Sequence, residues 1–126
     1  MTRVGDTSAL YALFDEDDDF HPPAKAALED PEPIAVPTEI LVETVDLVAY
    51  RSTERLARRG LGWLLDRPNV RIADPVHMPA VREVHRDADG ELSLADAFVI
   101  QTCRALGADP LAFDEAIRQR VSVDTG

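Results

Sequence analysis

The sequence has a single cysteine and no long uninterrupted apolar segment. Cys103 alone cannot build a disulfide framework or a cysteine-based zinc site. The longest strongly apolar stretch runs over residues 40–50, is interrupted by Glu43 and Asp46, and is too short to span a bilayer. The segment MTRVGDTSAL at the N-terminus lacks the apolar core of a secretory signal. These absences predict a cytoplasmic protein without a membrane segment.

Positive charge is also scarce. The chain has 24 Asp and Glu residues against 13 Lys and Arg residues, a formal net charge of −11, and Lys25 is its lone lysine. Such a chain repels nucleic acid unless cations or a local basic patch intervene. Since concentrated salt screens this repulsion, one hypothesis is a salt-loving source with a halophilic-like acidic surface; the alternative is an ordinary small acidic protein. Equal melting temperatures in dilute and multimolar KCl would contradict the first hypothesis.

The order of elements predicts one α/β domain over residues 1–126. The length and the 45% apolar content suffice for one core. Short strands are expected around Val4 and at 34–36, 69–73, 110–113 and 121–123. Helices are expected at 7–14, 23–29, 38–51, 53–65, 79–86 and 93–107, with a last short helix starting at Asp114. Because the strands are apolar without alternation and are separated by helices, they predict a central parallel sheet flanked by helices.

Acidic residues follow two of the predicted strands directly. Asp6 comes after the strand around Val4, and Asp114 comes after Leu111-Ala112-Phe113. Ligands of open parallel sheets bind at the carboxyl ends of the strands, so both carboxylates should lie at that edge. Each of them, taken alone, is more often a structural residue, the N-cap of the helix that it starts.

Two further acids have structural explanations of their own. Asp96 is the polar member of an apolar helical stripe, but Ser93-Leu94-Ala95-Asp96 also fits a capping box. Glu43 shares a helical stripe with Glu39 and Asp46, which is typical of a solvated face.

The case for a site depends on all four acids together. Two like charges about 4 Å apart cost about 4 kcal/mol at an effective dielectric constant near 20, so a cluster of four requires cations or raised pKa values. Mg²⁺ and Mn²⁺ prefer oxygen ligands and retain waters. Such a centre suits hydrolysis of phosphodiesters.

Four segments, in order, resemble the PIN domain, the nuclease fold of VapC-type toxins. The resemblance covers nearly the whole chain and rests on DTSAL at residues 6–10, VPTEILVE at 36–43, LSLADAFVI at 92–100 and LAFD at 111–114. The order Asp, Glu, Asp, Asp and the spacing between Asp96 and Asp114 also suit the family. Gly5 stands where an apolar residue is usual, and Ala112 where Thr or Ser is frequent.

The resemblance implies a Mg²⁺- or Mn²⁺-dependent endoribonuclease. The metal-binding acids would be Asp6, Glu43, Asp96 and Asp114, with Ser8 as a supporting polar residue that orients them. It also implies an RNA substrate, a small antitoxin partner in a type II toxin–antitoxin pair, and a homodimer. The alternative is a catalytically inactive PIN-like scaffold or interaction module in RNA processing. A phosphoacceptor receiver domain is rejected, since it needs a lysine after a late strand and Lys25 lies near the start.

An arginine stripe follows Tyr50 and includes Arg51, Arg55 and Arg58. Such a stripe predicts contacts with RNA phosphates, which would make binding depend on salt. The competing interpretation is a solvated helix face that pairs with Glu54 and neighbouring acids. If charge reversal at Arg55 and Arg58 left RNA affinity unchanged, the solvated face would be correct.

Overall fold

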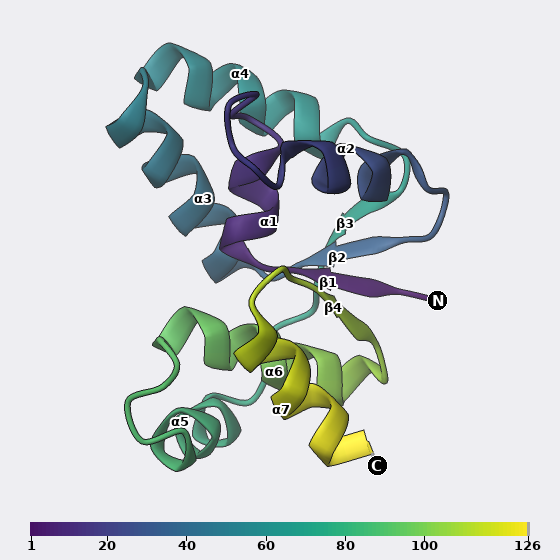
Figure 1. The fold of residues 1–126 in the computed structure, drawn as a ribbon, viewed down its shortest axis with the longest axis vertical. Coiled ribbons are helices and arrows are strands. Elements are labelled where there is room, and N and C mark those ends of the chain that lie inside the picture. Colours follow the sequence, from purple (N-terminus) through teal and green to yellow (C-terminus); the bar gives the residue numbers. More distant parts are fainter. Residues whose placement is uncertain (126) are drawn as a thin grey trace.

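Four short strands form one parallel sheet in the computed structural model, which describes residues 1–125 and the side chains of residues 1–121. The strands are β1 (Arg3–Gly5), β2 (Ile34–Val36), β3 (Val70–Ile72) and β4 (Asp109–Leu111), in the spatial order β3-β2-β1-β4 (Figure 1). Val4 of β1 is aligned with Ala35 of β2 on one side and with Pro110 of β4 on the other. The predicted parallel sheet with flanking helices is therefore confirmed.

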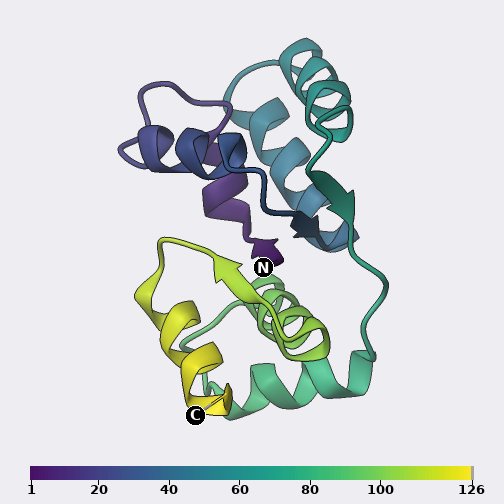
Figure 2. The same ribbon diagram turned by 90° about the vertical axis from the view of Figure 1, so that its right-hand side faces the viewer.

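Helices cover both faces of the sheet. One layer contains α1 (Thr7–Ala12), α2 (His21–Glu29), α3 (Thr38–Arg51) and α4 (Glu54–Leu65). The other contains α5 (Met78–Asp87), α6 (Leu94–Leu106) and α7 (Glu115–Thr125). Figure 2 shows the first group above the sheet and the second group below it. The fold is thus a three-layer α/β/α arrangement, and the chain crosses from one face to the other after β3.

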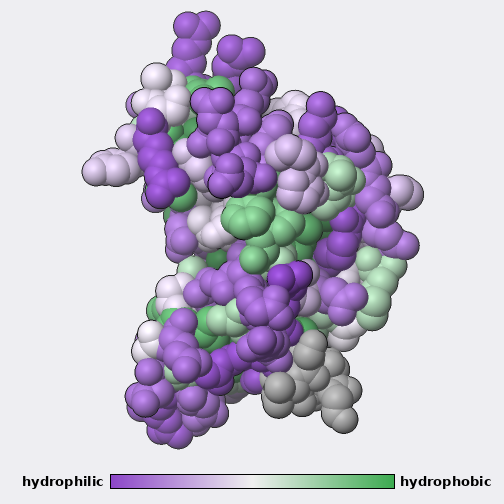
Figure 3. All heavy atoms as spheres, in the orientation of Figure 1, coloured by the Kyte–Doolittle hydropathy of each residue, from purple (hydrophilic) through white to green (hydrophobic). Residues whose placement is uncertain are grey.

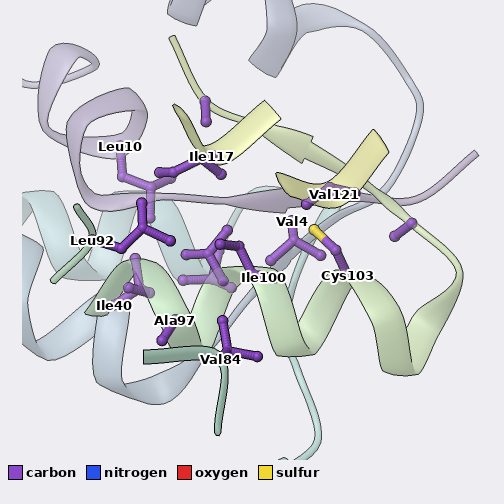
Figure 4. Packing of buried hydrophobic residues seen from close by; sticks show 14 of the residues in the cluster. Val4, Leu10, Ile40, Val84, Leu92, Ala97, Ile100, Cys103, Ile117 and Val121 are labelled. Carbon is purple, nitrogen blue, oxygen red and sulfur yellow. The ribbon is translucent and has the colours of Figure 1, made fainter. Parts of the chain in front are cut away.

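The buried core extends over both faces of the sheet, and one part of it lies where α6 and α7 pack against β1 and β4. Val4 and Ile100 are fully buried, and Ile117 and Val121 of α7 close the layer from outside (Figure 4). Isoleucine and valine at these positions pack without polar atoms, so burial removes apolar surface from water at little desolvation cost. Cys103 is buried in the same cluster, and burial followed by the charge of Asp109 raises the pKa of its thiol to about 12.

Helix starts and ends follow local capping chemistry. The Thr53 side chain accepts from the Leu56 N–H at 3.0 Å and begins α4. Gly107 ends α6. Its φ of 61° is a left-handed conformation, which glycine adopts without a steric penalty. These signals placed the bounds of α3, α4 and α6 within one residue of the prediction.

The strand predicted at 121–123 is wrong. These residues continue α7, which runs to Thr125. Ile117 and Val121 are four residues apart and both face the core, so the helical period buries them together. The strand expected at 110–113 is also displaced: β4 ends at Leu111, and Ala112 and Phe113 belong to the loop before α7.

None of the helices within residues 1–125 combines the length and the apolar character needed to cross a membrane.

Candidate functional site

Asp6 lies at the centre of the carboxyl edge of the sheet. It follows β1, which is an inner strand, and it is only 2% exposed. Its backbone N–H donates to the Leu111 carbonyl of β4 at 3.1 Å, and its Oδ1 accepts from the Ala9 N–H at 2.8 Å. Asp6 is therefore the N-cap of α1, as the capping interpretation predicted, and it is also a carboxylate buried at the edge where ligands bind.

Asp114 lies on the neighbouring chain segment. It directly precedes α7, and its Oδ1 accepts from the Ala116 N–H at 2.8 Å. The chain that leaves β1 enters α1 on one face of the sheet, whereas the chain that leaves β4 enters α7 on the opposite face (Figure 1). The two segments diverge there, which creates the crevice at a topological switch point that parallel sheets use for ligands.

Asp96 approaches the same edge from α6. Ser93 and Asp96 form the predicted capping box: the Asp96 N–H donates to Ser93 Oγ and the Ser93 N–H donates to Asp96 Oδ2, both at 3.1 Å. Val99, Ile100 and Cys103 on its stripe are buried. The box fixes the Asp96 carboxylate at the first turn of a helix that packs beneath β1.

Glu43 comes from the second turn of α3 and is exposed. Glu39, Asp46 and Tyr50 share its face and line an open groove with it, so the predicted acidic stripe does face solvent. Figure 3 shows the surface indented on the side where the strands end, between the two helical layers. Glu43 belongs to a helix that contacts α1, and its charge acts on Asp6.

The pKa of Asp6 responds to the charges of the three other acids. Burial raises the pKa of Asp6 from 3.8 to about 6, the Ala9 N–H opposes this increase, and the negative charges of Asp96, Asp114 and Glu43 raise the pKa further. The three other acids are thus close enough to act on Asp6 through the low-dielectric edge of the protein. The structure brings the four predicted acids to one region.

The four carboxylates surround Asp6 without forming a closed coordination shell. Among the residues whose side chains the structure describes, no three Asp, Glu, His or Cys groups are placed together as metal ligands. The donor set nevertheless fits a hard divalent cation, because it consists of oxygens alone. One carboxylate oxygen accepts a hydrogen bond from a backbone N–H in each of Asp6, Asp96 and Asp114. This bond orients the second oxygen of the same carboxylate. Mutual repulsion favours separation of the carboxylates, and a shared cation would reverse that preference.

Two small residues near Asp6 depart from the family pattern. A Cβ at Gly5 would lie 3.2 Å from Leu10 Cδ2, so a side chain there would require Leu10 to shift by a few tenths of an ångström. Ala112 is buried and supplies no hydroxyl. Thr7 Oγ1 is buried beside Asp6 without a hydrogen-bond partner among the described residues, and Ser8 is exposed in the first turn of α1. The supporting role of Ser8 stays a prediction.

The arginine stripe lies around the α3–α4 connection, one helix length away from the start of α3. Arg55 and Arg58 are exposed, and the ion pairs found among the described residues do not include them or Glu54. The Arg51 guanidinium lies over the Tyr11 ring at 4.8 Å. The pairing with Glu54 is therefore not seen, and phosphate binding by this stripe stays a prediction.

A second recess lies at the opposite end of the sheet. It has a volume of about 380 Å³ and is lined by residues just before β2 and β3, including Pro33, Asn69 and Arg67. None of the four predicted acids contributes to it. The presence of a recess therefore does not by itself identify the site, whereas the carboxylates and the switch point agree on the other edge.

Sequence reasoning overlooked two aromatic residues at this edge. Phe113 directly precedes Asp114, and its ring stacks on Phe20 with centroids 4.8 Å apart and an interplanar angle of 11°. The signal that would have indicated Phe113 is an aromatic residue adjacent to an acid at a strand end. Nothing in the local sequence pairs it with Phe20.

Comparisons with known proteins agree with this fold. The family model of the PIN domain matches residues 4–121. The crystal structure of VapC20 from Mycobacterium tuberculosis, described as a sarcin–ricin loop cleaving toxin, has a TM-score of 0.76 at 24% identity and covers 93% of this chain and 92% of its own. VapBC2 from Rickettsia felis, bound to a DNA fragment from its promoter, has a TM-score of 0.69 at 12% identity and covers 94% of this chain and 92% of its own. No curated protein matches the sequence significantly.

The two structures are too distant in sequence to carry more than the fold, which they share with this chain over nearly its whole length. The family model supplies the identification, since its match runs from Val4 in β1 through the three other strands and includes all four acids. The chain belongs to the PIN domain family.

Proposed function

We propose that this chain is a metal-dependent endoribonuclease. The observation that carries the proposal is the burial of Asp6 at the switch point of the sheet, with its pKa raised to about 6 and three further acids acting on it. A protein gains no stability by burying a carboxylate beside other carboxylates. Such an arrangement is typical of sites where function requires it.

Asp6, Glu43, Asp96 and Asp114 would hold Mg²⁺ or Mn²⁺. When bound, the cation supplies charge neutralisation for a phosphate oxygen and a water of lowered pKa. The chain itself contributes orientation: backbone N–H groups fix one oxygen of three of the acids, so the free oxygens point in set directions. Glu43, which is exposed, can move toward the cation or toward a substrate. Ser8 would support the acids from the start of α1.

RNA is the proposed substrate, although the chain as a whole repels it. A cation at the four acids lowers the local negative potential, and Arg51, Arg55 and Arg58 offer positive charge farther along the molecule. The VapC20 structure is described as that of a sarcin–ricin loop cleaving toxin, which agrees with a nuclease activity for this fold.

We further propose that the nuclease is the toxin of a type II toxin–antitoxin pair, acting in the cytoplasm as a homodimer with a small antitoxin as partner. The proposal draws on the resemblance to VapC-type toxins, on the PIN family match and on the VapC20 structure, which is described as that of a toxin. Induced expression should arrest growth, and co-expression of an adjacent small gene should relieve it. Arrest by an Asp6→Asn chain as severe as that by the unsubstituted chain would contradict a nuclease toxin.

An RNA cleavage assay tests the enzymatic proposal. The protein should cut RNA with Mg²⁺ or Mn²⁺ in high salt, and EDTA should stop the reaction. Asp6→Asn and Asp96→Asn should each lower the rate to background, because each removes an anionic oxygen from the centre. Equal cleavage by the unsubstituted protein and both variants would reveal a contaminant, and no cleavage under any condition would favour the inactive scaffold.

A further inference from the structure

A pair of stacked aromatic rings borders the four acids. Phe113 is the residue before Asp114, so their Cα atoms are about 3.8 Å apart. Its ring is nearly parallel to that of Phe20, which comes from the loop between α1 and α2 and is 45% exposed. An open, flat apolar surface therefore lies within one residue of a proposed metal ligand.

Three contacts fix this surface relative to the acids. Phe113 is held through the chain by Asp114, whose carboxylate accepts from Ala116. The Phe20 N–H donates to Asp18 Oδ1 at 2.8 Å. The next residue, His21, donates from Nδ1 to the Ala12 carbonyl at 2.6 Å; a carbonyl only accepts, so Nδ1 carries the proton. These two contacts hold the backbone at Phe20 next to α1, and the stack on Phe113 places its ring.

Packing alone does not account for a phenylalanine at position 20. The stack covers one face of its ring, and much of the remainder stays in water. The preceding residues 15–19 are all acidic. Their field repels phosphate groups, so the uncharged base is the part of an RNA strand that can approach the ring closely. Bases of single-stranded RNA stack on aromatic side chains, largely independently of their sequence.

We propose that Phe20 and Phe113 form a stacking platform for a base of single-stranded RNA beside the phosphodiester held at the four acids. The inference rests on the proposed RNA cleavage and adds to it the residue pair that positions an unpaired strand. The two rings already pack on each other, and Asp18 and Ala12 hold the chain at Phe20 and His21. The two phenylalanine side chains therefore lose little conformational entropy when a base binds.

Binding of two oligomers to the inactive Asp6→Asn protein tests the platform. One is an oligoadenylate of a dozen nucleotides; the other is a ribose-phosphate chain of equal length and charge without bases. By fluorescence anisotropy, the oligoadenylate should bind about fivefold to a hundredfold more tightly, the range expected for one base–aromatic stack. Adding Phe20→Leu should remove most of this difference and leave binding of the baseless chain unchanged. Phe20→Trp should preserve it, because indole also stacks.

Trp63 provides a matched control. It is 43% exposed, and its ring contacts Phe14 edge to face at 5.9 Å on the far side of α1. Trp63→Leu should leave the preference for the oligoadenylate intact. In the active protein, Phe20→Leu should raise KM for single-stranded RNA while kcat changes little, since the stack binds ground state and transition state alike.

The outcomes separate the platform from the proposed function. If both oligomers bind equally, or if Trp63→Leu lowers the preference as much as Phe20→Leu does, the platform is wrong even when RNA is cleaved. If the preference depends on Phe20 but the active protein cleaves no RNA, the platform stands and the nuclease proposal fails.

Discussion

Asp6→Asn is expected to stabilise the metal-free protein at about pH 8 while RNA cleavage is lost. The pKa of Asp6 is raised from 3.8 to about 6, chiefly by burial and then by the charges of the other acids. One pKa unit corresponds to about 1.4 kcal/mol, so ionised Asp6 opposes folding by up to about 3 kcal/mol. Asparagine removes the charge and is as good an N-cap as aspartate, so the bond from the Ala9 N–H can remain.

The sign of the pH dependence follows from the raised pKa. Below about pH 4, Asp6 is protonated in the folded and the unfolded chain, so the substitution should be nearly neutral. As the pH rises through about 6, the folded chain retains the proton longer than the unfolded chain, and the unsubstituted protein loses stability. The advantage of Asp6→Asn should therefore appear between about pH 4 and pH 6 and persist above it.

Urea unfolding of both proteins across this pH range, with EDTA present, measures the effect. Asp30→Asn is a matched control: Asp30 Oδ1 also accepts from a backbone N–H, at 2.9 Å, but the residue is exposed and is not among the acids whose charges act on Asp6. It should show no gain at about pH 8. If Asp6→Asn were instead destabilised by a kcal/mol or more at this pH, Asp6 would be a structural cap and not a strained functional carboxylate.

The second large effect is expected from divalent cations. A ligand present at a hundred times its dissociation constant stabilises the folded state by about 2.7 kcal/mol, which corresponds to a rise in Tm of about 10 °C for a chain of this size. MnCl₂ should produce such a rise at about pH 8. At about pH 5 the rise should be much smaller, because the cation must displace the proton that Asp6 retains.

The Asp6→Asn protein should show little rise in Tm with MnCl₂ at either pH. The acidic loop at residues 15–19 is the main competing place for a cation, and substitution of Asp17 by asparagine there should leave the rise unchanged. A shift that survives Asp6→Asn but disappears with Asp17→Asn would place the cation in the loop.

The fold was largely predictable because local signals were strong. The strand at 34–36 and the helix at 38–51 have the bounds that were expected from a short apolar run and a long apolar stripe. The sequence of β1 has little strand character beyond Val4. The strand forms because it hydrogen-bonds to two neighbouring strands that are distant in sequence, which no local pattern indicates. The end of α7 was mispredicted because Val121 has high strand propensity, while its burial opposite β4 depends on tertiary packing.

The candidate site was predictable in unequal degrees. Asp6 and Asp114 could be placed at one edge because parallel strands end together. Asp96 could be placed through its capping box. Glu43 could not be separated from Glu39 and Asp46 by periodicity, since all three share one face of α3; the charges that raise the pKa of Asp6 include that of Glu43. The pairing of Phe20 with Phe113 is a tertiary contact that no local pattern contains.

The central claim is that Asp6, Glu43, Asp96 and Asp114 act as one cation-holding centre that cleaves RNA. The most direct test compares Mn²⁺-dependent RNA cleavage by Glu43→Gln with that by Glu39→Gln and Asp46→Asn, three charge-neutral substitutions on the same helix face. We expect Glu43→Gln to lower the rate at least a hundredfold, by about 3 kcal/mol, and the other two to retain the rate of the unsubstituted protein. Equal rates in all three variants would contradict the four-acid centre.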